Sequence, residues 1–251
     1  MKKHENSNIV ITGAGRGLGL AYARHLASEG ASIGIAETDG ARGQAAAKLL
    51  RKQGANALFY ETDVSSETST RDMTDYFIDQ WGRIDGLVAN AGLANSVGGS
   101  LCEEISVEQW DKIMAVNVRG TWLTCRAVIP FMKEQRCGSI VTIGSDTALW
   151  GSPRLLHYVT SKGAIVAFTR AMARELGEAG IRINCIAPGL VRNEATAGVP
   201  DSRHEWNVQG RALARESSED DIVGTVSFLL SEEAAFITGQ LIVVDGGLVF
   251  H

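Results

Sequence analysis

The stretch NIVITGAGRGLGLAYARHLASEG, residues 8–30, decides the fold. Its first residues, 8–12, are mostly β-branched and apolar, as a strand buried on both faces requires. A glycine-rich turn follows, and residues 18–30 then carry the apolar spacing of a helix that stops at Gly30. A strand that runs through a glycine turn into a helix is the first part of a strand–helix–strand unit.

The same alternation continues to the end of the chain. Further short apolar runs predict strands at 31–37, 57–64, 84–92, 138–145, 181–189 and 240–247. Helical patterns separate most of them, at 41–54, 68–82, 106–117, 118–135, 156–179 and 220–231. This pattern predicts an α/β fold, a single-domain Rossmann-type doubly wound parallel sheet of about seven strands with helices on both faces. We expect residues 1–251 to form one dinucleotide-binding and catalytic domain, with a substrate loop or lid at about 190–217.

Composition excludes several classes of function. The chain has 251 residues, of which 45% are hydrophobic, and a net charge of -5 without any basic run, so nucleic acid is not an expected partner. No apolar run reaches the roughly 18 residues of a transmembrane helix, and the polar start lacks a signal peptide, so no membrane association is expected. The four cysteines are scattered, which favours reduced thiols in a cytoplasmic protein and no metal site.

The glycine turn points to a phosphate ligand. Gly13, Gly17 and Gly19 give the spacing GxxxGxG rather than the common GxGxxG. Glycines let the backbone approach a ligand closely, and the following helix N-terminus offers free N–H groups to a pyrophosphate. Tight packing alone is the competing explanation, but ligands of such sheets bind at the carboxyl ends of the strands, where this turn lies.

Glu37, at the end of the second predicted strand, indicates which dinucleotide binds. A carboxylate there accepts hydrogen bonds from the adenosine ribose hydroxyls and repels a 2′-phosphate, so NAD is favoured over NADP. Two alternatives stay open at this point. In the first, Glu37 is a solvated residue at a strand end without a role in binding. In the second, Arg16 assists the 2′-phosphate of NADP.

The motifs together resemble the short-chain dehydrogenase/reductase (SDR) family, in the oxidoreductase subtype of about this length. The resemblance covers the whole chain and rests on motifs in a fixed order: TGAGRGLG (12–19), DV (63–64), NAG (90–92), Asn117, Ser145, YVTSK (158–162), PG (188–189) and VDGG (244–247). It implies Asn117, Ser145, Tyr158 and Lys162 as catalytic residues. The cofactor residues that it implies are Gly13, Arg16, Gly17, Leu18, Gly19, Glu37, Asp63, Val64, Asn90, Ala91, Gly92, Tyr158, Lys162, Pro188, Gly189, Leu190 and Val191.

The spacing of Tyr158 and Lys162 suits proton transfer at a substrate oxygen. A free phenol has a pKa of about 10, too high for a good base, and we expect the nearby Lys162 ammonium to lower it. The two residues lie four apart, on one helix face. Ser145 would hold the substrate oxygen. By the resemblance, Lys162 also binds the nicotinamide ribose, and Asn117 holds a water that links Lys162 to solvent.

The substrate is less well defined. The resemblance lines the pocket with Ser145, Trp150, His157, Leu190 and Trp206, together with Leu93, Asn95 and Leu155. The two tryptophans favour an apolar, aryl or cyclic secondary alcohol or ketone, unless they serve the core or a subunit contact. Two departures from the family stand out. Asn193 and Thr196 lie near the place of a cofactor-contacting threonine, and Asp146, after Ser145, either binds a substrate hydroxyl or caps a turn, the latter being favoured.

The sequence therefore predicts an NAD-dependent alcohol dehydrogenase or ketone reductase. Alternatives within the family are an NADPH-dependent 3-oxoacyl-thioester reductase and a polyol or sugar dehydrogenase. A non-catalytic NAD-sensing module on the same fold would lack Tyr158, Lys162 or Ser145, and all three are present. The resemblance also implies a homotetramer, formed through the helices at 118–135 and 156–179.

Overall fold

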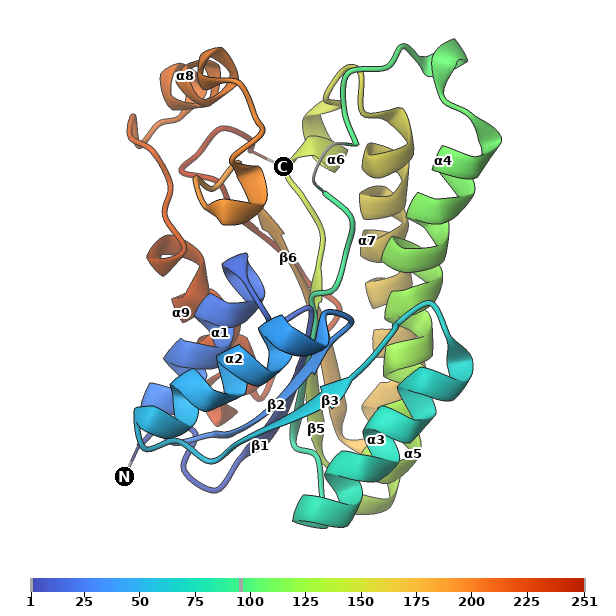
Figure 1. The fold of residues 1–251 in the computed structure, drawn as a ribbon, viewed down its shortest axis with the longest axis vertical. Helices are drawn as coiled ribbons and strands as arrows, with labels where there is room; N and C mark the ends of the chain where they lie inside the picture. The colour runs from blue at the N-terminus through green and yellow to red at the C-terminus, as the bar shows by residue number, and fades with distance from the viewer. Residues whose placement is uncertain (1, 95–96, 251) are drawn as a thin grey trace.

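A computed structural model describes residues 2–94 and 97–250 of the chain and contains one seven-stranded sheet (Figure 1). The strands are β1 (Asn8–Thr12), β2 (Ser32–Glu37), β3 (Ala57–Glu61), β4 (Gly86–Ala89), β5 (Gly138–Ile143), β6 (Ile181–Pro188) and β7 (Leu241–Val244). Their order is β3-β2-β1-β4-β5-β6-β7, and every neighbouring pair is parallel. The predicted fold class is confirmed.

Helices cover both faces of this sheet (Figure 1). One face carries α1 (Gly17–Ser28), α2 (Gly40–Lys52) and α9 (Asp220–Leu230), and the other carries α3 (Glu67–Trp81), α5 (Thr121–Gln135) and α7 (Leu156–Leu176). Shorter helices lie around the carboxyl edge: α4 (Val107–Ile113), α6 (Thr147–Trp150) and α8 (Asp201–Gly210).

Alternation along β1 explains the two layers. Ile9 and Ile11 are buried in one apolar cluster with Tyr22 of α1, whereas Val10 lies in the opposite cluster with Phe77 of α3. Successive strand residues point to opposite faces, so a strand that is apolar throughout needs a helix layer on each side.

The strand order reverses beside β1, which has β2 on one side and β4 on the other. The chain leaves β1 towards β2 and β3 and then returns to build the rest of the sheet from β4. A crevice opens at the carboxyl ends of the strands at such a reversal. The glycine turn after β1 and the NAG motif after β4 therefore meet at this edge.

Two segments differ from the predicted elements. The helices predicted to meet at 117–118 run without a break, because a π-helical turn, η2 (Met114–Gly120), joins α4 to α5. Within it the Asn117 carbonyl accepts a hydrogen bond from Thr121 Oγ1 at 2.9 Å. The polar stretch after β6, which showed no clear periodicity, contains α8.

Within residues 2–94 and 97–250, no helix combines the length and the hydropathy that crossing a membrane requires. All four cysteines are free thiols. The same part of the chain holds no group of three or more side chains that could bind a metal ion.

Candidate active site

The glycine turn after β1 forms a tight cradle at the N-terminus of α1. Gly13 and Gly17 adopt φ angles of +65° and +53°, which favour glycine. A Cβ on Gly19 would lie 2.2 Å from the Gly13 carbonyl oxygen, so only glycine fits there. The first turn of α1 leaves N–H groups without partners within the helix, and a pyrophosphate would bind at this turn.

Thr12 joins this cradle to the strand end on the other side of the reversal. Its Oγ1 accepts hydrogen bonds from the backbone N–H groups of Asn90 and Ala91, both at 3.0 Å. Asn90 Nδ2 in turn donates to the carbonyls of Thr12 at 2.9 Å and Gly13 at 3.2 Å. Thr12 was not singled out from the sequence, because its partners lie 78 and 79 residues away.

Glu37 turns its carboxylate towards the glycine turn. Oε2 accepts from the Gly15 N–H at 3.0 Å, and Oε1 accepts from the N–H groups of Thr38 at 2.9 Å and Asp39 at 3.3 Å. A Cβ on Gly15 would lie 2.8 Å from Glu37 Oε2, so the glycine turn and the end of β2 are in close contact. The carboxylate is thus held at the carboxyl end of β2, where an adenosine ribose would lie.

Two arginines lie near this carboxylate, and both are matched by acidic groups. Arg16 and Arg42 approach the same Glu194 oxygen, at 3.9 and 3.7 Å, and Arg42 also pairs with Asp39 at 3.2 Å. The sequence pointed to Arg16 and missed Arg42, because Arg42 lies on α2 rather than directly after Glu37. Glu194, on the segment after β6, thus links that segment to Arg16 of the glycine turn and to Arg42 of α2.

The remaining cofactor candidates lie along the same edge. Asp63 is exposed after β3, and its Oδ1 accepts from Ser65 Oγ at 2.7 Å, whereas Val64 is buried against Gly120. Gly92 closes the run after β4, where a Cβ would lie 3.6 Å from Lys162 Nζ. Of the other members of the set, Leu18 lies in the first turn of α1 and Pro188 ends β6. The chain just after β4 holds Ala91, and the chain just after β6 holds Gly189, Leu190 and Val191.

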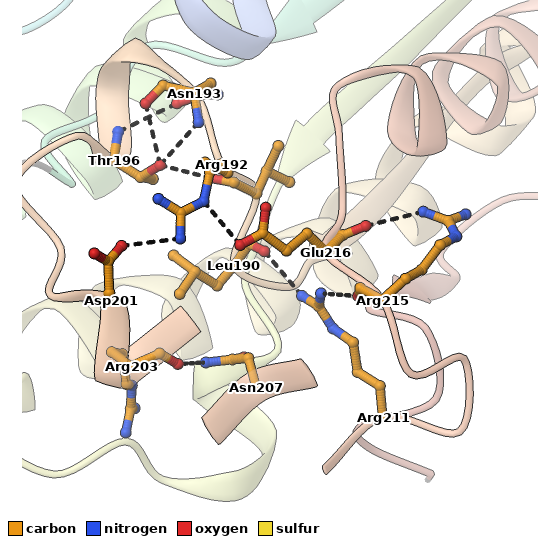
Figure 2. A network of polar contacts seen from close by, with 11 residues as sticks. Leu190, Arg192, Asn193, Thr196, Asp201, Arg203, Asn207, Arg211, Arg215 and Glu216 are labelled. Atoms are coloured by element: carbon orange, nitrogen blue, oxygen red, sulfur yellow. Dashed lines mark hydrogen bonds and ion pairs between the residues drawn. The ribbon is translucent and has the colours of Figure 1, made fainter. Parts of the chain in front are cut away.

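The segment after β6 is held by a polar network (Figure 2). Arg211 donates to the Leu190 carbonyl at 2.8 Å, and Arg192 donates to Asp201 at 3.1 Å and to Glu216 at 2.9 Å. These contacts tie the residues that follow Pro188 to α8 and to the stretch before α9.

Thr196, near the place of the family's cofactor-contacting threonine, is turned towards its own segment. Its hydroxyl donates to the Val191 carbonyl at 2.6 Å and accepts from the Asn193 N–H at 3.0 Å (Figure 2). Asn193 Oδ1 accepts from the Thr196 N–H at 3.2 Å, which closes the turn. The two residues thus serve the local fold of the loop.

Lys162 is buried under the edge of β5. Its Nζ donates to the Ile143 carbonyl at 2.8 Å and lies 5.7 Å from the centre of the Tyr158 ring. Burial lowers the pKa of Lys162 to about 8. Asn117 lies beside it, since a Cβ on Gly92 would lie 3.3 Å from Asn117 Oδ1 and 3.6 Å from Lys162 Nζ.

Asn117 is fixed by the chain after β4. Oδ1 accepts from the Leu93 N–H at 2.7 Å, and Nδ2 donates to the Leu93 carbonyl at 3.2 Å and to Ser161 Oγ at 3.0 Å. Its place inside the π-helical turn explains how a residue of low helix propensity is accommodated.

Ser145 lies after β5 and is buried. Its Oγ accepts from Thr147 Oγ1 at 2.8 Å and donates to Asp146 Oδ1 at 3.3 Å. Asp146 directly precedes α6 as its N-cap residue, where its side chain makes no capping hydrogen bond, although the Thr147 N–H acts to lower its pKa. The turn-cap interpretation therefore stays a prediction. Burial and the charge of Asp245 raise the pKa of Asp146 to about 6.

Tyr158, on the first turn of α7, does not show the lowered pKa that we expected. Burial raises the pKa of Tyr158 to about 12, the Asp146 charge adds to this, and the neighbouring Ser145 hydroxyl acts in the opposite direction. The expectation that Lys162 lowers it is wrong for this arrangement, because Lys162 is bound to the Ile143 carbonyl and the loss of hydration dominates.

Only part of the expected substrate set comes together. Trp150 of α6 and Trp206 of α8 lie with ring centres 5.1 Å apart. Arg203 lies against both rings, with Cζ 4.9 and 4.8 Å from their centres. His157 is buried, and among the described residues its Nδ1 has no hydrogen-bond partner. Asn95 lies outside the described residues.

Comparison with known proteins identifies the family. A family model described as enoyl-(acyl carrier protein) reductase, within the short-chain alcohol dehydrogenase group, matches residues 13–249. The chain belongs to the short-chain dehydrogenase/reductase family. Members of the SDR family are oxidoreductases that use NAD(H) or NADP(H), so the predicted reaction class and cofactor class hold at this level.

Curated relatives of this SDR chain carry different names. It is 34% identical to 3-oxoacyl-(acyl-carrier-protein) reductase FabG of Chlamydia trachomatis, and 97% of each chain is covered. It is 37% identical to 2-(S)-hydroxypropyl-CoM dehydrogenase 3 of Xanthobacter autotrophicus, with 97% of each covered. It is 32% identical to cyclohexanol dehydrogenase of a Rhodococcus species, with 96% of this chain and 95% of that one covered.

Solved structures agree with the fold. A short-chain type dehydrogenase/reductase from Mycobacterium marinum superposes with a TM-score of 0.93 at 30% identity, covering 99% of this chain and 98% of that one. The SDR architecture therefore extends over the whole described chain.

Proposed function

We propose that this SDR protein is an NAD(H)-dependent oxidoreductase that interconverts a secondary alcohol and its ketone. The observation that carries the proposal is the convergence of Ser145, Tyr158 and Lys162 at the sheet edge that also holds the glycine cradle and Glu37. A proton donor, a hydroxyl and a cation lie beside a cradle that fits a dinucleotide, which is the set that hydride and proton transfer at one C–O unit requires.

In this proposal Tyr158 moves the proton at the substrate oxygen. With a pKa raised to about 12 the phenol stays protonated near neutral pH, so its ready role is to donate a proton to the oxygen of a ketone. Ser145 holds the same oxygen by a hydrogen bond. When bound, the nicotinamide supplies the hydride donor or acceptor at the carbon.

Lys162 and Asn117 support the proton path. Lys162, buried and bound to the Ile143 carbonyl, would reach the nicotinamide ribose beside Gly92. Asn117, held by the Leu93 backbone, would fix the water that connects Lys162 to solvent.

The preference for NAD over NADP rests on Glu37. Its carboxylate already accepts three backbone N–H groups, which hold it in place for the ribose hydroxyls. Arg16 and Arg42 are offset by Glu194 and Asp39, so neither guanidinium is left to attract a 2′-phosphate strongly.

For the substrate we propose an apolar, aryl or cyclic body, in line with the paired rings of Trp150 and Trp206. Residues 190–217 would act as the lid of a single catalytic domain, with α8 bringing Trp206 to Trp150. The second candidate is a 3-oxoacyl-thioester reductase using NADPH, which the pair Arg16 and Arg42 near the ribose position would favour.

We also propose that the chain is a cytoplasmic homotetramer. The outer surface of α4, η2, α5 and α7 has a hollow of about 800 Å³ lined by Met114, Ala115, Val118, Trp122, Phe168 and flanking polar residues. Trp122 is 43% exposed there, an unusual state for a large apolar ring unless a second subunit covers it. Light scattering tests this state, and Trp122→Glu should shift the particle to a smaller mass.

The function is tested by titrating NADH and NADPH into the protein and then assaying ketones and alcohols with the cofactor that binds more tightly. The proposal expects NADH to bind more tightly and aryl or alicyclic ketones to be reduced. Turnover restricted to polyols, or to acyl-thioesters with NADPH, would establish one of the alternatives instead.

A further inference from the structure

One side chain of the lid carries a charge that the proposed reaction does not use. Arg203, on α8, packs against Trp150 and Trp206, and its Nη2 donates to Ser152 Oγ at 2.7 Å. In Figure 2 its side chain points away from the polar network that holds the rest of the lid. The arginine thus joins the lid to the segment around α6, next to the predicted substrate pocket.

The Arg203 guanidinium uses few of its hydrogen-bond donors within the protein. It has five N–H donors, and within residues 2–94 and 97–250 only Ser152 accepts a hydrogen bond from them. No carboxylate of that part of the chain lies within ion-pair distance of it, although Asp146 acts on it from further away. Burial nevertheless lowers the pKa of Arg203, so the loss of hydration outweighs the help from Asp146.

Its position connects it to the reacting oxygen. Asp146 contacts the Ser145 hydroxyl and also lies close enough to Arg203 to favour its charge. Asp146 thus links Ser145, by a hydrogen bond, to Arg203, by charge, and Arg203 lies against the two tryptophan rings. A substrate that is held by Ser145 and extends towards these rings would bring its far end to the guanidinium.

We propose that Arg203 binds an anionic group, of the size of a carboxylate, at the end of the substrate opposite the reacting carbon. A guanidinium that stacks on aromatic rings and keeps most of its N–H donors unused suits in-plane binding of a carboxylate. The inference rests on the proposed function and narrows its substrate class to ring-bearing secondary alcohols or ketones with an acidic group.

The buried carboxylate of Asp146 works against an anionic ligand and must be included. Its pKa is raised to about 6, so an approaching anion meets a group that takes up a proton readily. Asp245 acts on Asp146, and its carboxylate is held by three backbone N–H groups, from Gly247, Leu248 and Val249. Arg203 is a cation whose charge Asp146 favours.

The test compares two ketones that differ only in charge, 4-acetylbenzoate and its methyl ester. Binding of each to the protein, with and without NAD⁺, is measured by isothermal titration, and NADH-dependent reduction is assayed alongside. We expect the wild-type protein to bind the carboxylate about tenfold more tightly than the ester, as a charge-assisted hydrogen bond provides. Arg203→Met should abolish this ratio, and Arg203→Lys should keep part of it.

Arg192→Met is the matched control, because Arg192 holds the lid through Asp201 and Glu216 without contacting the tryptophans. This variant should weaken the binding of both ketones equally and leave the ratio of their affinities unchanged. Equal affinity for the two compounds, no binding of either, or a ratio that survives Arg203→Met overturns the inference. Failure of the proposed function has a different signature, namely carboxylate-selective binding without any oxidation of NADH.

Discussion

The hydroxyl of Ser145 donates a hydrogen bond to Asp146 Oδ1 at 3.3 Å, while Thr147 Oγ1 donates a hydrogen bond to Ser145 Oγ at 2.8 Å. An ionised carboxylate only accepts hydrogen bonds, so the proton shared by this pair belongs to Ser145. In that state Ser145 has no proton left for the oxygen of a ketone. Protonation of Asp146 reverses the bond and frees the Ser145 proton for the substrate.

This relationship predicts a pH dependence of ketone reduction. Burial and Asp245 raise the pKa of Asp146 to about 6, so the carboxyl is protonated below that pH and ionised above it. The rate of reduction should therefore rise as pH falls through about 6. Asp146→Asn, whose amide can donate to Ser145, should remove this inflection and raise the rate at pH 7.5 by about threefold to tenfold. Profiles of kcat from pH 5 to 9 test this prediction. An inflection that persists in Asp146→Asn contradicts the assignment of the inflection to Asp146.

Tyr158 should give oxidation and reduction opposite pH requirements. Oxidation needs the phenolate, and with a pKa of about 12 this form becomes more abundant as pH rises. The oxidation rate should therefore keep increasing from pH 6 to pH 9 without a plateau. Tyr158→Phe should lower kcat about a thousandfold in both directions while NADH still binds. A Phe variant of near wild-type activity would remove Tyr158 from the proton path.

The sequence predicted those features that depend on local pattern. Continuous apolar strands require helices on both faces, and Gly19 is needed wherever a turn is this tight, so both could be read without coordinates. Glu37 could be placed because the end of a strand fixes where its last side chain lies. Contacts between distant segments could not be predicted from local pattern. Thr12 contacts Asn90, 78 residues away, and Arg203 contacts Ser152, 51 residues away.

The pKa of Tyr158 was missed for a related reason. The spacing to Lys162 shows that the two residues share a helix face, but it does not show how deeply they are buried. Here burial decides the direction of the shift, and it depends on the packing of α7 against the sheet. The same limit applies to Asp146, whose burial and contact with Ser145 do not follow from its sequence position.

Thr12 should stabilise the chain as well as the cradle. Thr12→Val keeps the shape but leaves the partly buried N–H groups of Asn90 and Ala91 without their acceptor, which we expect to reduce the free energy of unfolding by about 1–3 kcal/mol. Thr12→Ser keeps the hydroxyl and is the control. Urea denaturation measures the difference, and equal losses in the two variants would assign the effect to packing of the methyl group.

His4 should make stability fall in mild acid. It is buried against Ser227, with Nε2 3.2 Å from both the carbonyl and the hydroxyl, and burial lowers its pKa in the folded state. The unfolded chain then binds the proton more readily, so the contribution of His4 is complete above its unfolded pKa of 6.5 and is lost as pH falls below it. The Tm of His4→Gln should depend less on pH between 7 and 5 than that of the wild type. A His4→Gln variant whose Tm falls with pH as steeply as that of the wild type would contradict the argument.

Glu37 gives the most direct test of cofactor choice. Glu37→Gln keeps the shape of the side chain but removes the charge that opposes a 2′-phosphate, so NADPH affinity should rise about tenfold while NADH affinity falls slightly. Asp39→Asn is the matched control, because it removes a charge two residues away while an amide oxygen still caps α2 through the Arg42 N–H. Cofactor fluorescence titrations measure both affinities. If Asp39→Asn improves NADPH binding as much as Glu37→Gln does, the preference comes from the summed charge of this surface, and Glu37 is not the residue that selects the cofactor.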